Sequence, residues 1–281
     1  MQLQEIYEKI GLQPEVKEKL EEISGKVSLS RWETYLKGMS DPETAEASYL
    51  ELSDALPEDP GNFVMLCCQL ECARRAVDRY AGKEIPESIF IDTMKCFPRF
   101  IDECKRKNGQ AYFDRGWWTY RQISMSLFRI GELEYELKPF NDKNAIGVHI
   151  PSDADLTPSK VDQSLRQAIR FMEKYYPDPV RDRFICESWL LSPVLKELLS
   201  ENSKILAFQN RFEIISDNRE DRDYIEWVFQ TPPDTEILQL PEKTSLQRNV
   251  KQLLLKGGNV GAGCGIIRIR EVNKGKVFNC T

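Results

Sequence analysis

The chain has 281 residues and a formal net charge of -6 at pH 7. Hydrophobic residues make up 41% of it and charged residues 30%, a composition that excludes a disordered or collagen-like chain. The negative charge argues against nucleic acid or an acidic membrane surface as the main partner, because such binding relies on a basic footprint.

The first part of the chain is helical by its hydrophobic periodicity. Asp41-Pro42 and Asp59-Pro60 each predict a helix start, because aspartate caps free amides and a proline at the first helical position loses no hydrogen bond. Apolar residues then recur at helical spacing over 63–80, and a further helix is expected over 86–97. These patterns predict a helical N-terminal domain over residues 1–125.

The period changes near Arg129, where apolar residues alternate with glutamates as in a half-buried strand. A helix is expected to begin at Thr157-Pro158 and to bury Val161 and Leu165. Strands are expected over 129–138, 145–150, 184–189, 212–216, 224–229 and 266–272. The predicted fold class is therefore α+β, with a mixed-sheet domain over 126–281 after the helical domain.

Nothing at the N-terminus resembles a signal peptide, and no stretch approaches the roughly 18 apolar residues that cross a bilayer. We therefore expect a cytoplasmic protein whose 8 cysteines stay reduced. His149 is the only histidine and no cysteine cluster has zinc-ligand spacing, so we expect no metal site.

Four segments have sequences that resemble those of one protein family: Leu127–Glu136, Val148–Leu156, Glu187–Leu191 and Thr244–Arg248. The chain, over nearly its whole length, resembles a bacterial acyltransferase-like family. That family has a helical N-terminal domain and a C-terminal domain similar to the GNAT N-acyltransferases. The resemblance implies a GNAT-like mixed sheet and acetyl-CoA or another acyl-CoA as co-substrate.

The resemblance also implies where the cofactor binds. In a GNAT fold the fourth and fifth strands splay apart, pantetheine lies in the opening, and the pyrophosphate meets free amides where the next helix begins. Here 145–150 would be the fourth strand and 184–189 the fifth, so Ile150 and Ser152 are candidate cofactor-binding residues. The sequence departs from the usual Gln/Arg-x-x-Gly-x-Gly/Ala loop over 152–158, which holds two acids and no glycine, and Gln209 stands where a tyrosine acid is usual.

A second candidate anion site is the basic C-terminal segment, which has seven basic residues and one acidic residue from Ser245 onward. Its candidate cofactor-binding residues are Arg248, Lys251, Lys256, Gly258 and Gly261. A solvated helix and a protected edge strand would show the same charges. Because the glycines follow a helix instead of preceding one, we favour a helix cap and close packing as their explanation.

Amine acylation needs a base that takes a proton from the acceptor. Glu187, His149 and Glu134 are the candidate catalytic residues, because they lie on the predicted central strands. His149 is a candidate to point into the cleft, although a lone histidine in a strand is more often an ordinary hydrogen-bonded residue. Glu187 lies in an apolar strand where burial would suit a base, although pairing with an arginine such as Arg129 is the commoner arrangement. Glu134 and Glu136 share one strand face, which would be either solvated or a wall of the cleft.

The leading hypothesis is an acyl-CoA-dependent N-acyltransferase that acts on a small amine or a similar acceptor. The alternative is a non-catalytic GNAT-like protein that binds a small ligand or a protein partner in the cleft. The altered loop and the missing tyrosine favour the alternative, whereas the polar residues on adjacent strands favour the enzyme. The expected partner is a small-molecule substrate, and neither nucleic acid nor a membrane. The acceptor, the acyl chain length and the oligomeric state stay open.

Overall fold

The computed structural model describes residues 1–137, 145–178, 181–232 and 234–273 of the chain. They fall into two structural units, Met1–Arg129 and Ile130–Thr281. None of the described helices is both long enough and apolar enough to cross a membrane. The described cysteines are free thiols, and all of them except Cys264 are buried.

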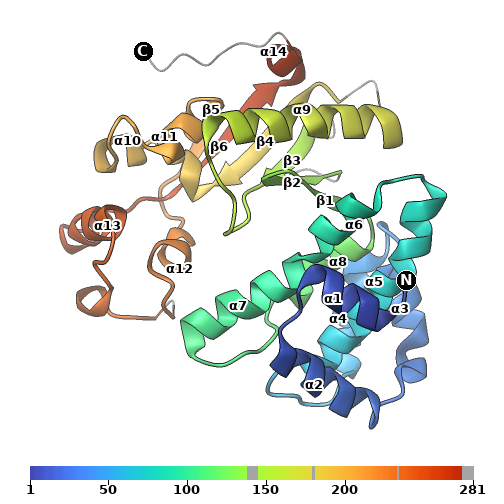
Figure 1. Cartoon of the computed structure of the whole chain (residues 1–281). Coiled ribbons are helices and arrows are strands. Elements are labelled where there is room, and N and C mark those ends of the chain that lie inside the picture. The colour runs from blue at the N-terminus through green and yellow to red at the C-terminus, as the bar shows by residue number, and fades with distance from the viewer. Residues whose placement is uncertain (138–144, 179–180, 233, 274–281) are drawn as a thin grey trace. The chain divides into compact units, whose positions relative to one another are not determined.

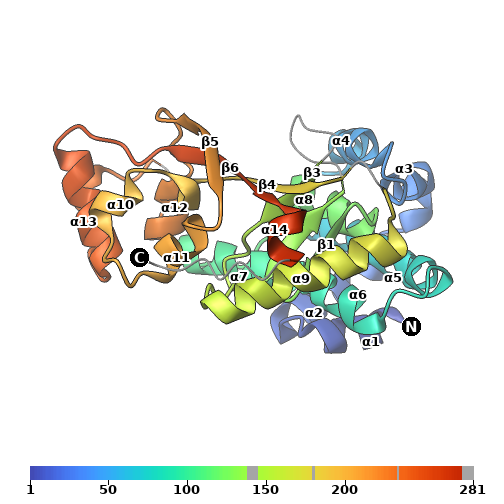
Figure 2. The same ribbon diagram turned by 90° about the horizontal axis from the view of Figure 1, so that it is seen from above.

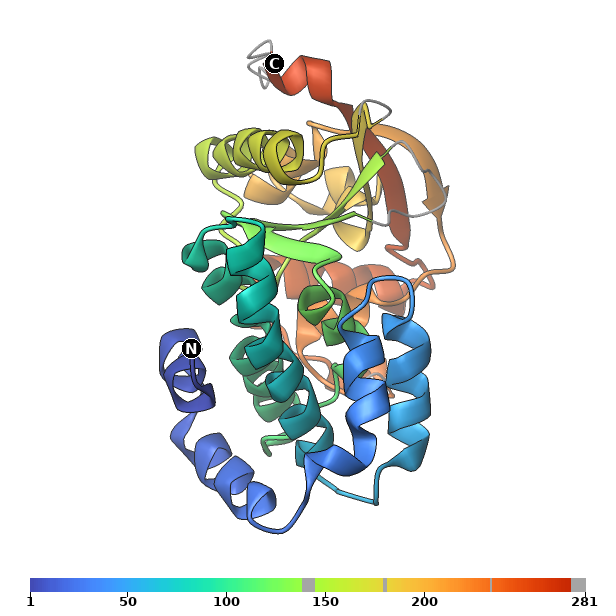
Figure 3. The same cartoon turned by 90° about the vertical axis from the view of Figure 1, so that its right-hand side faces the viewer.

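The first unit is built of helices, seen as the blue-to-green part of the chain in Figure 3. They are α1 (Leu3–Ile10), α2 (Pro14–Ser24), η1 (Leu29–Trp32), α3 (Glu33–Met39), α4 (Ala45–Ala55), α5 (Phe63–Gly82), α6 (Glu87–Met94), α7 (Cys96–Asn108) and α8 (Gly116–Ile123). No strand occurs before Leu127, where the structure describes every residue, and this confirms the predicted helical N-terminal region.

Asp59 contacts the start of α5, the longest helix of the first unit, but the residue at the cap position is Asn62. The Asp59 carboxylate accepts hydrogen bonds from the amides of Gly61 (3.1 Å) and Val64 (2.8 Å). The helix itself begins at Phe63, later than Pro60, because Asn62 adopts a left-handed φ of 54°. Most of α5 is buried, so this helix supplies much of the core of the unit.

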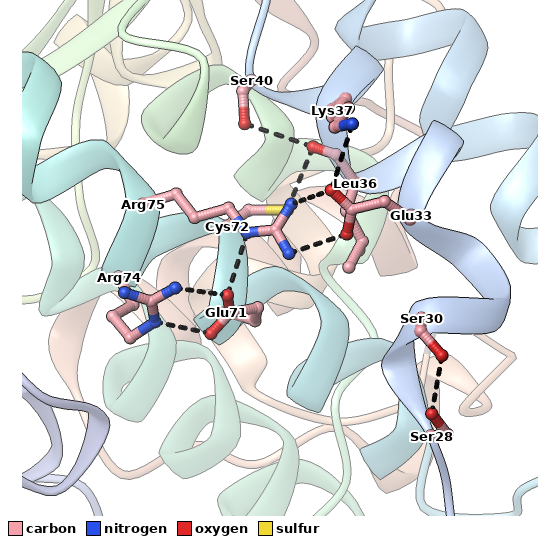
Figure 4. A network of polar contacts seen from close by, with 10 residues as sticks. All are labelled: Ser28, Ser30, Glu33, Leu36, Lys37, Ser40, Glu71, Cys72, Arg74 and Arg75. Atoms are coloured by element: carbon pink, nitrogen blue, oxygen red, sulfur yellow. Dashed lines mark hydrogen bonds and ion pairs between the residues drawn. The ribbon is translucent and has the colours of Figure 1, made fainter.

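Figure 4 shows the ion pairs that join α5 to α3. The Arg75 guanidinium donates to both carboxylate oxygens of Glu33, at 3.1 and 2.9 Å, and to Glu71 at 2.9 Å. Arg74 donates to Glu71 through two further hydrogen bonds of 2.7 Å. The hydrogen bond from Arg75 lowers the pKa of Glu33, so this network favours the ionised carboxylate.

A six-stranded mixed sheet has the order β1-β2-β3-β4-β6-β5, and all of it except most of β1, which precedes the boundary at Arg129, belongs to the second unit. Its strands are β1 (Leu127–Ile130), β2 (Leu133–Glu136), β3 (Ala145–His149), β4 (Arg183–Ser188), β5 (Glu213–Asn218) and β6 (Ala262–Arg268). The pair β3–β4 is parallel, whereas β2–β3, β4–β6 and β5–β6 are antiparallel. The predicted fold class is confirmed. The strand expected over 129–138 is instead two strands, because Gly131 makes a turn at a φ of 65°.

The helix α9 (Pro158–Tyr175) covers one face of this sheet (Figures 1 and 2). Its buried stripe includes Val161 and Leu165, as the periodicity predicts. Ser164 joins α9 to the sheet, because its hydroxyl lies 2.9 Å from that of Tyr135 and accepts from the Leu133 amide at 3.3 Å. Tyr135 therefore points toward α9.

The strand expected over 224–229 is wrong: these residues form the helix α12 (Tyr224–Phe229). Tyr224, Ile225, Val228 and Phe229 are buried, a spacing that places them on one side of a helix. They pack into an apolar cluster that also holds Val250. A short apolar run suits a strand or a buried helix equally well, and here the tertiary packing decides.

The remaining helices of the second unit are short. They are η2 (Trp189–Leu191), α10 (Leu195–Leu198), α11 (Lys204–Gln209), η3 (Ile237–Gln239), α13 (Ser245–Leu255) and α14 (Ile269–Asn273). Three helical elements, α12, η3 and α13, stand between β5 and β6 and form a helical insert around the apolar cluster.

The last strand begins inside the glycine-rich run, so the expectation of a strand over 266–272 is wrong at both ends. Gly263 and Gly265 of β6 face the turn η2. A Cβ on Gly263 would lie 2.4 Å from the Leu191 carbonyl oxygen, and one on Gly265 would lie 3.2 Å from the Leu191 side chain. Only glycine lets the turn pack this closely on the strand, which supports the packing account of these residues.

Candidate functional site

The strands β3 and β4 separate toward their C-terminal ends. Their described pairing consists of Ala145 with Arg183, Ile146 with Phe184, and Gly147 with Ile185. Beyond this point β3 runs on to His149 and β4 to Ser188 without pairing to each other. β4 stays paired with β6 over its whole length. The two strand ends therefore flank an opening in the sheet.

The sheet register places three candidate residues on the same face. Tyr135 points toward α9, so its neighbours Glu134 and Glu136 point to the opposite face. His149 is the cross-strand partner of Glu134 and therefore shares that face. Because Gly147 pairs with Ile185, Glu187 lies on this face too, at the level of His149 on the other side of the opening.

His149 lies within hydrogen-bond distance of a glutamate that is not its direct cross-strand partner. Its Nε2 atom lies 2.9 Å from Oε2 of Glu136, and the two side chains are only 12% and 9% exposed. Gly147 is the direct partner of Glu136 and makes room for this contact. A Cβ at Gly147 would lie 3.2 Å from Cβ of Glu136 and 3.5 Å from Nε2 of His149.

Glu187 is exposed, so the expectation that burial would adapt it as a base is wrong. Pairing with an arginine is wrong as well, because its carboxylate has no hydrogen-bond or ion-pair partner among the described residues. Its cross-strand neighbour is Cys264 of β6. The pKa of the Cys264 thiol is raised mainly by burial and further by the negative charge of Glu187. β4 exposes Glu187 because the strand ends where β3 has already diverged.

The start of α9 carries its own anion. The Asp155 carboxylate accepts from the Thr157 amide (3.0 Å) and hydroxyl (2.7 Å), and it pairs with Lys204 and Lys160, each at 2.9 Å. The hydrogen bond from Lys204, followed by those from Thr157 and Lys160, holds the pKa of Asp155 well below its usual range. In the preceding loop, Ile150 is half-buried and Ser152 is exposed. The Asp155 carboxylate thus accepts the hydrogen bond of the Thr157 amide, one of the amides to which a phosphate would bind.

A buried arginine, which the sequence did not single out, holds α9 in place. Arg211 donates to the Asp162 carboxylate at 2.7 Å and to the Pro158 carbonyl at 3.0 Å. It also donates to the Ala207 carbonyl within α11. The first turn of α9 and the helix α11 are therefore fixed together.

Gln209 fixes the turn that follows β4. Its side-chain amide donates to the carbonyl of Ser192 at 2.8 Å and to that of Leu190 at 3.3 Å. The side chain is buried, and its Oε1 atom has no hydrogen-bond partner within the part of the chain that the structure describes. Gln209, which stands where a tyrosine acid is usual, therefore stabilises the turn through these two hydrogen bonds.

The basic residues of α13 make contacts within the helical insert. Lys251 is 7% exposed, donates to the carbonyls of Leu238 (2.9 Å) and Leu240 (2.8 Å), and pairs with Glu242. Arg248 donates to the Glu242 carbonyl at 2.9 Å. Lys256 ends α13 and is exposed. In Figures 1 and 2, α10 and α11 lie between α13 and the start of α9.

Gly258 and Gly261 have the structural explanation that the sequence favoured. A Cβ at Gly258 would lie 2.5 Å from the Leu253 side chain. Gly261 has a φ of 72°, and its Cβ would lie 2.5 Å from the Asn218 carbonyl. Both positions require glycine for packing or backbone conformation.

Four further residues emerge from the geometry: Glu136, Lys160, Lys204 and Arg211. Only Glu136 had a usable signal in the sequence, because the strand pattern places it on one face with Glu134. Among the described residues no group of three or more histidine, cysteine, aspartate or glutamate side chains has a geometry that could hold a metal ion.

Comparison with protein families gives two matches that together span most of the chain. The N-acyltransferase N-terminal domain matches residues 1–125, and the GNAT-like C-terminal domain matches residues 127–267. No curated protein matches the sequence.

Solved structures of acyltransferases share this fold. An acyltransferase in complex with decanoyl-CoA and teicoplanin has a TM-score of 0.80 and 21% identity, covering 95% of this chain and 87% of that chain. An acyltransferase mutant in complex with octanoyl-CoA has a TM-score of 0.80 and 20% identity, covering 94% and 87%. An acyltransferase in complex with CoA and 10C-teicoplanin has a TM-score of 0.69 and 20% identity, covering 96% and 100%.

Proposed function

Because the chain belongs to the family that joins an N-acyltransferase N-terminal domain to a GNAT-like C-terminal domain, we propose that it transfers an acyl group from acyl-CoA to an amine. The observation that carries this proposal is the opening beyond Gly147 and Ile185, flanked by His149 and Glu187. Unpaired strand ends present amide and carbonyl groups that the two amides of pantetheine can bond. Ile150 and Ser152 lie in the loop that follows β3 and would contact the part of the cofactor that extends past the end of this strand.

The reaction assigns separate tasks to the two flanking residues. The exposed carboxylate of Glu187 attracts the acceptor as an ammonium ion, and His149 takes one proton from it. The free amine attacks the thioester carbonyl carbon, the C–N bond forms, and the C–S bond breaks as the intermediate collapses. The sulfur leaves as CoA thiol after taking the second proton from nitrogen. Glu134, buried beside His149, supplies a negative charge near the imidazolium.

We place the CoA phosphates at the start of α9, where Lys160 and Lys204 lie, and not on α13. Both lysines are exposed and bind the loop carboxylate of Asp155, so an incoming phosphate replaces an anion that is already there. Lys251, by contrast, uses its ammonium group on two carbonyls and Glu242 inside the insert.

We infer a medium-length acyl donor in preference to acetyl-CoA, because the similar structures were determined with octanoyl-CoA and decanoyl-CoA. Two of those structures are complexes with teicoplanin or its 10C form, a much larger molecule than a simple amine. An amine on an amino sugar or peptide is accordingly the first acceptor class to screen.

The proposal is tested by calorimetric titration with acetyl-, octanoyl- and decanoyl-CoA, followed by mass spectrometry of an amino-sugar panel. We expect the two longer donors to bind more tightly, and His149→Ala to abolish product while acyl-CoA still binds. Lys256→Ala, on the exposed end of α13, is the matched control. Failure of every acyl-CoA to bind would overturn the proposal.

Two observations favour the non-catalytic alternative. Asp155 and its two lysines already satisfy part of the phosphate site, and Gln209 has no proton to give a thiolate. A GNAT-like protein that binds a ligand in the opening without turnover would show acyl-CoA binding but no acylated product. The same titration and product screen separate the two functions.

A further inference from the structure

We propose that Glu136 is a positioning residue that fixes the tautomer of His149, so that Nδ1 is the imidazole nitrogen that takes the proton from the acceptor. This inference rests on the proposed function, because it assigns a role within the same reaction. Glu136 is distinct from Glu134, which the register places directly opposite His149.

The chemistry of the two groups determines which nitrogen holds a proton. Glu136 Oε2 lies 2.9 Å from Nε2 of His149, within hydrogen-bond distance. An ionised carboxylate only accepts, so Nε2 must be the donor of this bond. A neutral imidazole has a single N–H, and with that hydrogen on Nε2 the lone pair is on Nδ1.

The fold reserves space for this pair. Gly147 stands on β3 opposite Glu136 and two residues before His149, and its missing side chain lets the imidazole lean across to the diagonal glutamate. Any larger residue would place a Cβ 3.2 Å from Cβ of Glu136, a tight contact, and in van der Waals contact with Nε2 of His149 at 3.5 Å. Both side chains are nearly buried, where a charge-assisted hydrogen bond is stronger than in water.

The proton balance of the step follows from this assignment. Nδ1 accepts one proton from the acceptor ammonium, and the resulting imidazolium is stabilised because its Nε2–H already points to the Glu136 carboxylate. The amine forms the C–N bond, the C–S bond breaks, and the second nitrogen proton goes to the CoA sulfur. The imidazolium then returns its proton to water. One ammonium and one acyl-CoA give one amide, one CoA thiol and one proton.

Nuclear magnetic resonance reads this tautomer directly, because His149 is the only histidine in the chain. In protein labelled with ¹⁵N-histidine, at a pH where the ring is neutral, we expect Nε2 to show the shift of a protonated nitrogen and Nδ1 that of an unprotonated one. Glu136→Leu should give a mixture of tautomers, and Glu136→Gln, which keeps an acceptor oxygen, should retain part of the preference. Glu134→Gln is the matched comparison and should leave the tautomer unchanged.

Kinetics with the best acyl donor provide the second readout. We expect Glu136→Leu to lower kcat at least about tenfold with little change in KM for acyl-CoA, and to add nothing in a His149→Ala background. Gly147→Ala keeps both side chains and should shift the tautomer in the same direction as Glu136→Leu, which covers the case that the leucine variant does not fold. A proton on Nδ1 in the wild type, or an unchanged tautomer in both variants, would overturn the inference. Absence of acyl transfer by the wild type with the expected tautomer present would count against the proposed function alone.

Discussion

Asp155 is a carboxylate that the protein holds ionised without burying it. Lys204, Thr157 and Lys160 lower its pKa from the ordinary value of 3.8, and a lowered pKa means that ionisation of this group contributes to stability. That contribution is present above the ordinary value and disappears as the pH falls through the lowered pKa.

We therefore predict that Asp155→Asn is less stable than the wild type at pH 7. The difference should shrink as the pH falls below about 4, because the unfolded chain then protonates this carboxylate while the folded protein keeps it ionised to lower pH. Urea unfolding at several pH values measures it. A difference that stayed constant down to the lowest usable pH would mean that the charge of Asp155 is not what stabilises the loop.

The same loop yields a binding prediction. Replacing Lys160 and Lys204 together by alanine should weaken CoA binding at least tenfold, since each charge-assisted contact to phosphate contributes about 1.5–3 kcal/mol. Asp155→Asn should tighten binding, because it removes the competing anion. Equal affinities for wild type and double variant in a calorimetric titration would remove the start of α9 from the cofactor site.

At the scale of elements, substitutions in the basic helix α13 test whether the CoA phosphates bind to the C-terminal segment instead. Lys251→Met should leave CoA affinity unchanged but lower the free energy of unfolding by about 1–3 kcal/mol, because the Leu238 and Leu240 carbonyls lose their donor. The exposed Gln252→Ala on the same helix is the control and should change neither quantity. Weaker CoA binding by Lys251→Met would restore the C-terminal segment as a phosphate site.

The turn η2 gives a further prediction about an element. Gln209→Leu removes both hydrogen bonds that hold Leu190 and Ser192, and burial of the unsatisfied carbonyls should cost about 1–3 kcal/mol. Chemical denaturation measures the loss. A neutral substitution would show that the turn is fixed by its packing on Gly263 and Gly265 alone.

The helices and strands differ in how well the sequence predicted them. The stripe of α9 and the strands at 145–149, 183–188 and 213–218 follow from local periodicity and were predicted within a few residues. The helix α12 was missed because five apolar residues in a run of six carry no period that separates helix from strand. The pairing of His149 with Glu136 could not be predicted either, since it depends on the register of β2 against β3, which local pattern leaves open.

At the scale of the whole molecule, the two units have separate internal packing, and each can be perturbed by its own change. We predict two overlapping transitions in calorimetry. Octanoyl-CoA at 100 times its Kd should stabilise the second unit by about 2.7 kcal/mol. Arg75→Ala should lower the transition of the first unit, because it cuts the network between α3 and α5. A single transition that moved equally under both changes would mean that the units unfold as one.

The partial exposure of Cys264 provides a natural attachment site for a dye that reports ligand binding. The other described cysteines are buried, whereas Cys264 is half-buried and lies beside Glu187 on the neighbouring strand. A maleimide dye should therefore attach there in a Cys280→Ser background, since Cys280 is the one cysteine outside the described residues. Burial raises the pKa of the Cys264 thiol, so labelling should accelerate as the pH rises. The attached dye would then signal the arrival of a ligand at the opening of the sheet without any engineered cysteine.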